Sequence, residues 1–465
     1  MISFIKNIKI LHLKTKTISL FFLFTIMLVF TFGCIKRPIE SQKTPSYTIN
    51  TPGFTTSPTI LPTEKPELTY TDITLLSSGD IMYHGPQLKS AYVSSTGKYN
   101  FMDNFNHMKS IVSAADYAVV NFETTTANQN NYTSYPSFNS PLEVYDSIKD
   151  AGYDLLLFAN NHCYDNKKSG FLATLNQFKN YGFEYIGARA SLDEKTYIVK
   201  DINGVKLGLM NYADTLTQKN GQYYSINGIT INDGCEDYMD IYMRGEYDKL
   251  YQEVADKISD MKAQGADIII MYIHWGDEYI LEPVTSQTTV AQKLCDLGVD
   301  VIIGGHPHVI EPMEILTSQT NPDHSTICFY SLGNYISNQN RLSFQDLDPK
   351  IRPYTENGLT VTLTIRKYNT GDVFVKSIEY TPTWVHRYYC NDGYYDYNVL
   401  PLRQAIASPE SYGLYKSDFG LSHATSALAL TDPVFEKKVL SYNTSIADEI
   451  AAFSQYYDDN LKSAS

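Results

Sequence analysis

Positive charge is scarce in this sequence of 465 residues. It has 37 lysines and arginines against 51 aspartates and glutamates, which gives a formal net charge of −14. A protein that binds nucleic acid needs a basic stripe to displace counterions from the phosphates. The composition therefore argues against a nucleic-acid partner. A polyanionic ligand would have to meet a local cation, such as a bound metal.

Cysteine is sparse as well, and its spacing has no pattern. The six cysteines include no Cys-x-x-Cys pair, and an odd number remains after Cys34. Neither a disulfide framework nor a zinc knuckle is indicated. Cys295 and Cys328 lie in apolar stretches and are predicted to be small core residues. Cys163 follows His162 within a motif discussed below, so a thiol nucleophile there stays open as an alternative.

Long hydrophobic runs are also lacking. The run Ile18–Phe32 follows a lysine-rich start and is shorter than the roughly 20 residues that span a bilayer. It ends in Gly33-Cys34, and a small residue before a cysteine resembles a bacterial lipoprotein signal. We therefore expect an exported, membrane-anchored protein with a signal peptide and lipobox over residues 1–34 and lipidation at Cys34. A plain signal peptide or an uncleaved anchor helix remains the alternative.

The composition and hydrophobic pattern of the chain change twice after this signal. Residues 35–70 are rich in Pro, Thr and Ser and are predicted to form a semi-extended tether. Residues 71–400 alternate between short apolar runs and amphipathic stretches, which predicts one α/β domain. Residues 401–465 are predicted to be a mostly helical C-terminal extension and carry no motif of known chemistry.

The α/β interpretation depends on continuous apolar runs, which suit strands covered on both faces. The strand candidates are Ile73–Ser78, Tyr117–Phe122, Tyr153–Ala159, Glu184–Gly187, Val205–Tyr212, Asp267–Ile273, Val299–Gly304 and Thr326–Leu332. The helix candidates are Asn104–Ala114, Leu142–Ala151, Gly170–Tyr181, Tyr247–Gln264 and Ser286–Leu297. Glycine closes most of these helices, as in C-terminal caps. A hairpin is expected at Leu359–Arg366 and Val373–Tyr380, after a loop over residues 340–357.

Polar residues able to bind metal follow the C-terminal ends of the predicted strands, the edge at which α/β sheets bind ligands. They are Asp80, Glu123, Asn161, His274, His306 and His308. Each residue alone is weak evidence for a metal site. Successive strands end at the same edge of the sheet, however, so the six side chains are expected to lie close together. Carboxylate, amide and imidazole together suit Mn, Fe or Zn, one or two ions. In a two-metal site, Glu123 has the chemistry of a bridging ligand.

These segments resemble the bacterial capsule-synthesis CapA family, which is implicated in making or exporting poly-gamma-glutamate. The resemblance spans about residues 72–338 in the family's order. The matching motifs are Gly79-Asp80-Ile81-Met82, Asn121-Phe122-Glu123, Ala159-Asn160-Asn161-His162 with Asp165, His274-Trp275-Gly276, Gly305-His306-Pro307-His308 and Ser331-Leu332-Gly333-Asn334-Tyr335.

The family is similar in turn to calcineurin-like metallophosphoesterases. That similarity implies a four-layer α/β sandwich, two packed sheets flanked by helices. It also implies roles: Asp80 and His308 on a first metal, Glu123 as the bridge, and Asn161, His274 and His306 on a second metal. His162 would be the general acid, and Asp165 would orient it.

Two positions depart from the phosphoesterase pattern. Its first motif is usually Asp-x-His, but here the third residue is Met82, and the usual bridging aspartate is Glu123. The first metal position is therefore weak, empty or completed by another group, for which His84 is a candidate. Asn334 either lines the cleft or closes the sheet edge.

From the resemblance we expect a role in capsule or poly-gamma-glutamate biosynthesis. One reading is a metal-dependent hydrolase or transferase that acts on a cell-envelope anionic polymer or a phosphoester. The other is a non-catalytic accessory that binds or guides the polymer during export. Capsule ligase or exporter subunits are the expected protein partners.

Overall fold

The computed structural model describes residues 67–127, 131–218, 223–390 and 393–462. Contacts divide the chain after Glu64, and every described residue belongs to the second part. The predicted signal peptide, the lipidation site Cys34 and nearly all of the predicted tether lie outside the described residues. Within the ranges given, no helix combines the length and the apolar character that crossing a membrane requires.

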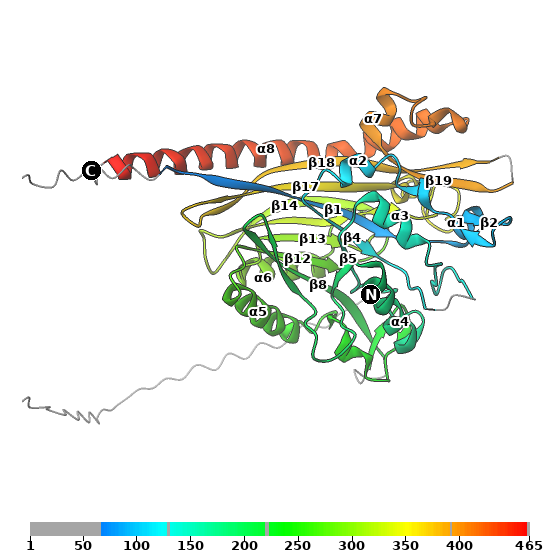
Figure 1. The fold of residues 1–465 in the computed structure, drawn as a ribbon, viewed down its shortest axis with the longest axis horizontal. Helices are drawn as coiled ribbons and strands as arrows, with labels where there is room; N and C mark the ends of the chain where they lie inside the picture. Colours follow the sequence, from blue (N-terminus) through cyan, green and yellow to red (C-terminus); the bar gives the residue numbers. More distant parts are fainter. Residues whose placement is uncertain (1–66, 128–130, 219–222, 391–392, 463–465) are drawn as a thin grey trace, which may run out of the picture. The chain divides into compact units, whose positions relative to one another are not determined.

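Two mixed β-sheets form the frame of the domain (Figure 1). In the described part of the chain, the first sheet has eight strands in the order β19-β18-β17-β1-β4-β5-β6, with β16 beside β1. Strands β1, β4, β5 and β6 run parallel to one another, whereas β17, β18 and β19 are antiparallel to their neighbours. The bounds are β1 Tyr70–Ile81, β4 Tyr117–Phe122, β5 Leu155–Leu157, β6 Glu184–Ile186, β16 Asn334–Ile336, β17 Asn357–Tyr368, β18 Val373–Tyr389 and β19 Tyr395–Pro401.

The second sheet has nine strands among the described residues, in the order β10-β9-β8-β12-β13-β15-β14, with β7 and β11 also paired to β8. Its central strands β8, β12, β13 and β15 are parallel. The bounds are β7 Ile198–Ile202, β8 Val205–Gln218, β9 Tyr223–Ile226, β10 Ile229–Thr230, β11 Ile241–Met243, β12 Ile268–His274, β13 Val301–Gly305, β14 Ile310–Thr317 and β15 Ser325–Leu332. Tyr92–Val93 (β2) and Lys98–Tyr99 (β3) form a separate small hairpin.

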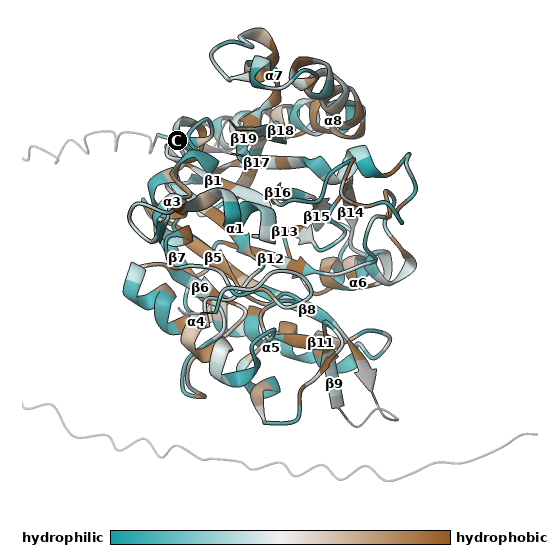
Figure 2. Cartoon of the chain, turned by 90° about the vertical axis from the view of Figure 1, so that its right-hand side faces the viewer, coloured by the Kyte–Doolittle hydropathy of each residue, from teal (hydrophilic) through white to brown (hydrophobic). Residues whose placement is uncertain are grey.

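Apolar side chains fill the space between the two sheets, and successive residues of one strand serve different cores. Ile268 and Ile270 of β12 belong to the core between the sheets, whereas Ile269 and Met271 belong to the core on the far face. This alternation follows from the two-residue period of a strand. Figure 2 shows the hydrophobic segments gathered in inner strands such as β5 and β12.

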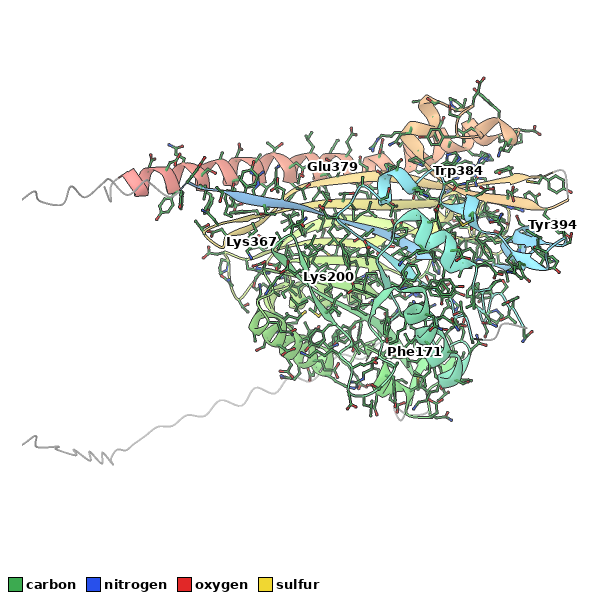
Figure 3. The ribbon with its side chains drawn as sticks, in the orientation of Figure 1. Phe171, Lys200, Lys367, Glu379, Trp384 and Tyr394 are labelled. Carbon is green, nitrogen blue, oxygen red and sulfur yellow. The ribbon has the colours of Figure 1, made fainter. Side chains whose placement is uncertain are left out.

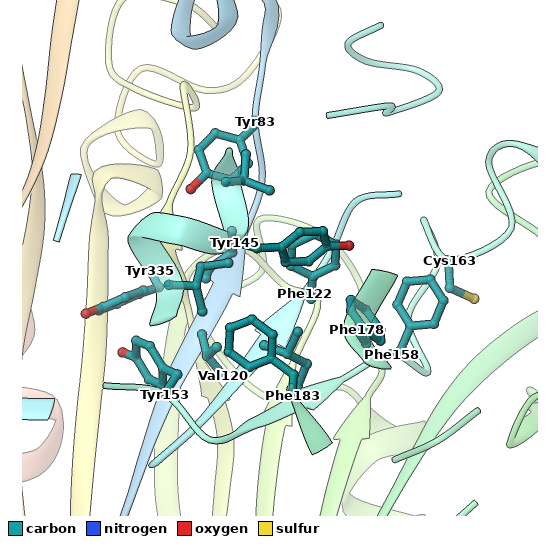
Figure 4. Packing of buried hydrophobic residues seen from close by; sticks show 14 of the residues in the cluster. Tyr83, Val120, Phe122, Tyr145, Tyr153, Phe158, Cys163, Phe178, Phe183 and Tyr335 are labelled. Carbon is teal, nitrogen blue, oxygen red and sulfur yellow. The ribbon is translucent and has the colours of Figure 1, made fainter. Parts of the chain in front are cut away.

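Helices cover the outer faces of both sheets. The helices α1 Gly85–Ala91, α2 Lys109–Val112, α3 Val144–Ala151 and α4 Lys167–Tyr181 lie on the first sheet, and α5 Asp248–Ala263 and α6 Thr285–Asp296 on the second. In the outer core of the first sheet, the Phe178 ring lies 5.3 Å from that of Phe122 and 5.1 Å from that of Phe158 (Figure 4). The mixed α/β class predicted from the sequence is confirmed.

The long C-terminal helix α8 (Gly420–Lys462) lies along β18 (Figure 1). Its Phe435 is fully buried in the core between the sheets, 6.2 Å from the ring of Phe329 on the second sheet. Helix α7 (Leu402–Ala407) and the start of α8 pack around Trp384 of β18, which is labelled in Figure 3. The residues after Pro401 are thus largely helical and part of the packing.

Each of the eight predicted strands overlaps an observed strand, although β5 is shorter than predicted, and the predicted hairpin is β17–β18. Gly152, Gly182, Gly265 and Gly298 have positive φ after their helices, as cap residues should. The predicted helix Asn104–Ala114 is wrong in extent, because only Lys109–Val112 is α-helical. Its first residues, Asn104 to His107, are weak helix formers and turn instead. The predicted loop 340–357 contains a 3-10 turn.

A close approach of backbone to backbone supports the strand that leads into the histidine loop. A Cβ on Gly304 would lie 1.9 Å from the carbonyl oxygen of Tyr330 and 2.6 Å from Nε1 of Trp275. We expect Gly304→Ala to lower the free energy of unfolding by about 3 kcal/mol, because the overpacked backbone must shift. Urea unfolding measures this loss. Gly85→Ala is the control, since its Cβ would meet no atom closer than 3.7 Å; equal losses would contradict the argument.

Candidate metal site

The site begins at the carboxyl end of β1, where Asp80 is fully buried. Its Oδ1 accepts a hydrogen bond from Nδ2 of Asn121 at 2.7 Å, and its Oδ2 accepts one from the backbone N–H of His306 at 3.1 Å. A Cβ on Gly305 would lie 2.8 Å from this carboxylate. Glycine is therefore required beside Asp80, and the carboxylate ties the first sheet to the histidine loop of the second.

Glu123 follows β4 and lies at the centre of the cluster. Its Oε1 is 3.5 Å from Nε2 of His274 and 3.7 Å from Nε2 of His308. Neither carboxylate oxygen has a hydrogen-bond partner among the described residues, although the side chain is fully buried. Burying a carboxylate is costly, and the two nearby imidazoles offset only part of that cost.

Two groups of donor atoms share this glutamate. One consists of Asp80, Glu123 and His308, and the other of Glu123, His274 and His306, with the donor atoms of each group within 4.8 Å of one another. Oδ1 of Asn161 lies 2.9 Å from Nε2 of His274 and so joins the second group. Nδ1 of His306 lies 3.2 Å from the same nitrogen. The six residues predicted from strand ends are thus brought together.

The residues fit a metal pair. A carboxylate with both oxygens unpartnered lies between two donor sets, and oxygen and imidazole nitrogen are ligands of divalent transition metals. The identity of such an ion does not follow from these donors, which suit Mn, Fe and Zn alike. The same donors exclude a thiolate site, because no cysteine belongs to either described group.

The loop between His306 and His308 is strained. His306 has φ of 96° and His308 has φ of 56°, a region that non-glycine residues rarely occupy. Such strain persists where surrounding contacts impose it, and it gathers at functional sites. Here the contacts include the bond from the His306 amide to Asp80 and the bond from the Tyr279 amide to the carbonyl of Pro307, at 2.8 Å.

The histidines differ in charge although all lie deep in the site. Burial lowers the pKa of His308, but Glu123, Asp80 and Glu278 outweigh it and raise the pKa to about 9. The charge of Glu123 likewise raises the pKa of His274 against the effect of burial. Burial and the two neighbouring histidines hold the pKa of His306 well below its usual range.

His162 and Asp165 form a second unit beside this cluster. Both are buried, and Nδ1 of His162 lies 2.7 Å from Oδ2 of Asp165. The same oxygen accepts the backbone N–H of Phe138 at 2.7 Å, while Oδ1 accepts a bond from Asn227 at 2.8 Å. Asp165 therefore fixes the tautomer with the proton on Nδ1. Burial raises the pKa of the neighbouring Cys163 thiol, which argues against the alternative of a thiol nucleophile.

A cleft of about 380 Å³ opens beside both units. Its walls combine histidine, aromatic, amide, hydroxyl, thioether and carboxylate side chains. Among the residues that the structure describes, no lysine or arginine lines it. The lining residues are Met82, His84, Tyr135, Phe138, His162, Glu278, Tyr279, His308, Asn338, Gln339, Ser343 and Phe344.

The two further cleft candidates have different places. His84 lines the cleft, and its Nδ1 accepts the backbone N–H of Asn338 at 3.3 Å. Burial lowers the pKa of His84 to about 3. Asn334 is fully buried beside the cleft and is not among its lining residues; its Nδ2 donates to the carbonyl of His308 at 3.3 Å. This hydrogen bond supports the histidine loop.

Sequence reasoning missed Glu278, Tyr279 and Asn227. Glu278 and Tyr279 follow His274 closely, so their position after a ligand-bearing strand was the available signal. Asn227 comes from the turn between β9 and β10 and has no local pattern. Trp275, which directly follows His274, does not line the cleft: it is buried, and its Nε1 donates to the carbonyl of Tyr330 at 2.9 Å.

Comparison with known proteins identifies the family. Residues 74–339 match the family described as "Bacterial capsule synthesis protein PGA_cap", over half of the chain. The chain belongs to this family. It is 30% identical over 279 residues to the "PGA biosynthesis protein CapA" of Bacillus subtilis (strain 168), covering 58% of this chain and 65% of that relative. It is 27% identical over 279 residues to the "Capsule biosynthesis protein CapA" of Bacillus anthracis, covering 57% and 60%. The matches span less than two thirds of either relative.

The raised pKa of His308 predicts proton-coupled metal binding in this family member. At neutral pH its imidazole carries a proton, which a metal must displace, because ligation requires the neutral ring. We expect the apparent affinity for Mn²⁺ to rise about tenfold per pH unit from pH 6 to 8, with release of at least one proton. Calorimetry in buffers of different ionisation enthalpy measures this. A pH-independent affinity would contradict the assignment.

Proposed function

We propose that this protein is an exported, membrane-tethered component of capsule or poly-gamma-glutamate biosynthesis. In this proposal it is a metal-dependent hydrolase or transferase for a cell-envelope anionic polymer or a phosphoester. Membership of the capsule-synthesis family supports the pathway. The observation that carries the chemistry is Glu123, a buried carboxylate without hydrogen-bond partners that two donor groups share.

The architecture supports the same proposal. Two sheets packed face to face, with helices on both outer faces, agree with the four-layer arrangement of calcineurin-like metallophosphoesterases. The ligand-bearing segments come from both sheets: Asp80, Glu123 and Asn161 from the first, and the three histidines from the second. A pair of metals held there would polarise a phosphoryl or acyl oxygen and supply a nucleophile near neutral pH.

His162 has the geometry of a general acid. Asp165 engages Nδ1, so Nε2 is the nitrogen left to deliver a proton to a leaving group. Its ring lines the cleft and packs edge-on against Phe138, with centroids 4.6 Å apart. In this role Asp165 is a positioning residue, since it acts through the tautomer of His162.

The lining of the cleft makes anion binding depend on the metals. The described lining has no lysine or arginine, and Glu278 in it opposes an anion, so His308 is its one cationic side chain until a metal displaces the proton. The bound ions would supply the positive charge that a phosphate or carboxylate requires. A polymer such as poly-gamma-glutamate would then enter with one anionic group at the metals and with uncharged contacts to the aromatic and amide side chains.

A second candidate function is non-catalytic. Met82 is buried where the phosphoesterase pattern has a histidine ligand, and a thioether is a poor ligand for a hard metal. A site with one strong metal position would hold an anionic polymer without turning it over. The protein would then guide the polymer toward ligase or exporter subunits.

Metal content tests the site itself. We expect the purified full chain in detergent to hold one or two equivalents of Mn, Fe or Zn by elemental analysis. Glu123→Ala and His306→Ala remove donors of the described groups and should lose at least one equivalent. Glu282→Ala and His107→Ala are the matched controls and should retain the wild-type content. A wild type without metal after incubation with all three ions would refute the catalytic proposal.

Turnover separates the two functions. With a dialkyl phosphodiester and poly-gamma-glutamate as probes, whose leaving groups need a proton, His162→Asn should lower kcat about 100-fold or more at unchanged metal content. Asp165→Asn should lower kcat less and change its pH profile, because the tautomer of His162 is no longer fixed. His107→Asn is the control. Metal-loaded wild type that binds poly-gamma-glutamate but converts neither probe would favour the accessory role.

A further inference from the structure

The first donor group lacks one ligand of the phosphoesterase pattern. Asp80, Glu123 and His308 supply three side chains, and Met82 does not replace the missing imidazole. His84 is not the substitute, because its Nδ1 already accepts the backbone N–H of Asn338 and its ring packs edge-on against Phe138.

Glu278 lies beside the first donor group, next to His308. Its Oε1 is 3.9 Å from Nε2 of His308, the nitrogen that is 3.7 Å from Oε1 of Glu123. Two donor atoms that each lie about 2.1 Å from one ion are about 3.0 to 4.2 Å apart, depending on the angle between them. The separation of Glu278 from His308 falls in that interval. Glu278 is outside the set of donor atoms that lie within 4.8 Å of one another, so it would shift toward a bound ion, which its 41% exposed side chain allows.

The backbone on both sides of Glu278 is held in place. On one side, the Arg244 guanidinium pairs with Asp277 at 2.5 Å. On the other, Tyr279 has φ of 64°, and its amide donates to the carbonyl of Pro307, between the two loop histidines. Gln339 donates to the Tyr279 hydroxyl at 3.2 Å. The backbone at Glu278 is thereby tied to the loop that carries His308, while its side chain remains free to adjust.

We propose that Glu278 completes the first metal position with Asp80, Glu123 and His308, in place of the imidazole that Met82 does not provide. The inference rests on the proposed metal-dependent function and adds a ligand that neither the sequence motifs nor the comparisons assign. Within the described ranges, no lysine or arginine lies within 4.0 Å of the Glu278 carboxylate, so no fixed cation competes for it.

A carboxylate in this position makes the two metal positions chemically unequal. The first has three carboxylates and one imidazole, an oxygen-rich set that suits Mn²⁺. The second has two imidazoles, one amide and the shared carboxylate, a set that suits Zn²⁺ or Fe²⁺. The two positions would then favour different ions, with the oxygen-rich position on the side of the cleft that Glu278 and His308 line.

The test uses Mn²⁺ and the full chain in detergent, with three variants. Glu278→Gln keeps the shape but removes the charge, Glu282→Gln is the control on the same segment, and Glu278→Gln with Met82→His restores an imidazole. We expect wild type to bind two equivalents. Glu278→Gln should lose one equivalent or weaken the second by about tenfold or more. The control should match wild type, and the double variant should regain the second equivalent.

Each other outcome has a distinct meaning. Two equivalents at wild-type affinity in Glu278→Gln would refute the ligand role, and so would an equal loss in Glu282→Gln. Loss of both equivalents from Glu278→Gln would also refute it, since the effect would not be confined to one position. Thermal unfolding of the metal-free variants reports any folding defect separately. If wild type binds no metal, the proposed function itself fails, a result distinguishable from a failure of Glu278 alone.

Discussion

The buried carboxylate of Glu123 is the constraint on which the rest of the site depends. It is fully buried, yet no described residue donates a hydrogen bond to it. Desolvating an ionised group costs several kcal/mol, and in the metal-free protein the charge of His308 offsets part of that cost. A bound cation would offset the remaining cost. The feature that destabilises the metal-free centre is therefore the one that would favour a bound metal.

The strained histidine loop follows from this constraint. His306 and His308 must both face one carboxylate although only Pro307 separates them, and the backbone turns through two positive φ values to achieve this. The bond from the His306 amide to Asp80 stabilises that turn. Asp80 thus has two tasks, one as a candidate ligand and one as a brace, which a sequence motif does not distinguish.

Much of this was predictable from the sequence, because local patterns determine it. Continuous apolar runs located every expected strand, and the polar residues after them were the ones that converge. The misses are of another kind. β14 contains Pro312 and lies at a sheet edge, where proline is tolerated, so its pattern did not read as a strand. Glu278 and Tyr279 are placed by contacts to Pro307 and Gln339, far along the chain, which no local periodicity encodes.

The helix α8 has a consequence for the dimensions of the centre. The candidate ligands come from two separate sheets, so a displacement of one sheet against the other would change every distance between them. Phe435 of α8 is inserted between these sheets and contacts Phe329 of the second, while the helix itself runs along β18 of the first. A helix that contributes no candidate ligand thus packs against both sheets that do.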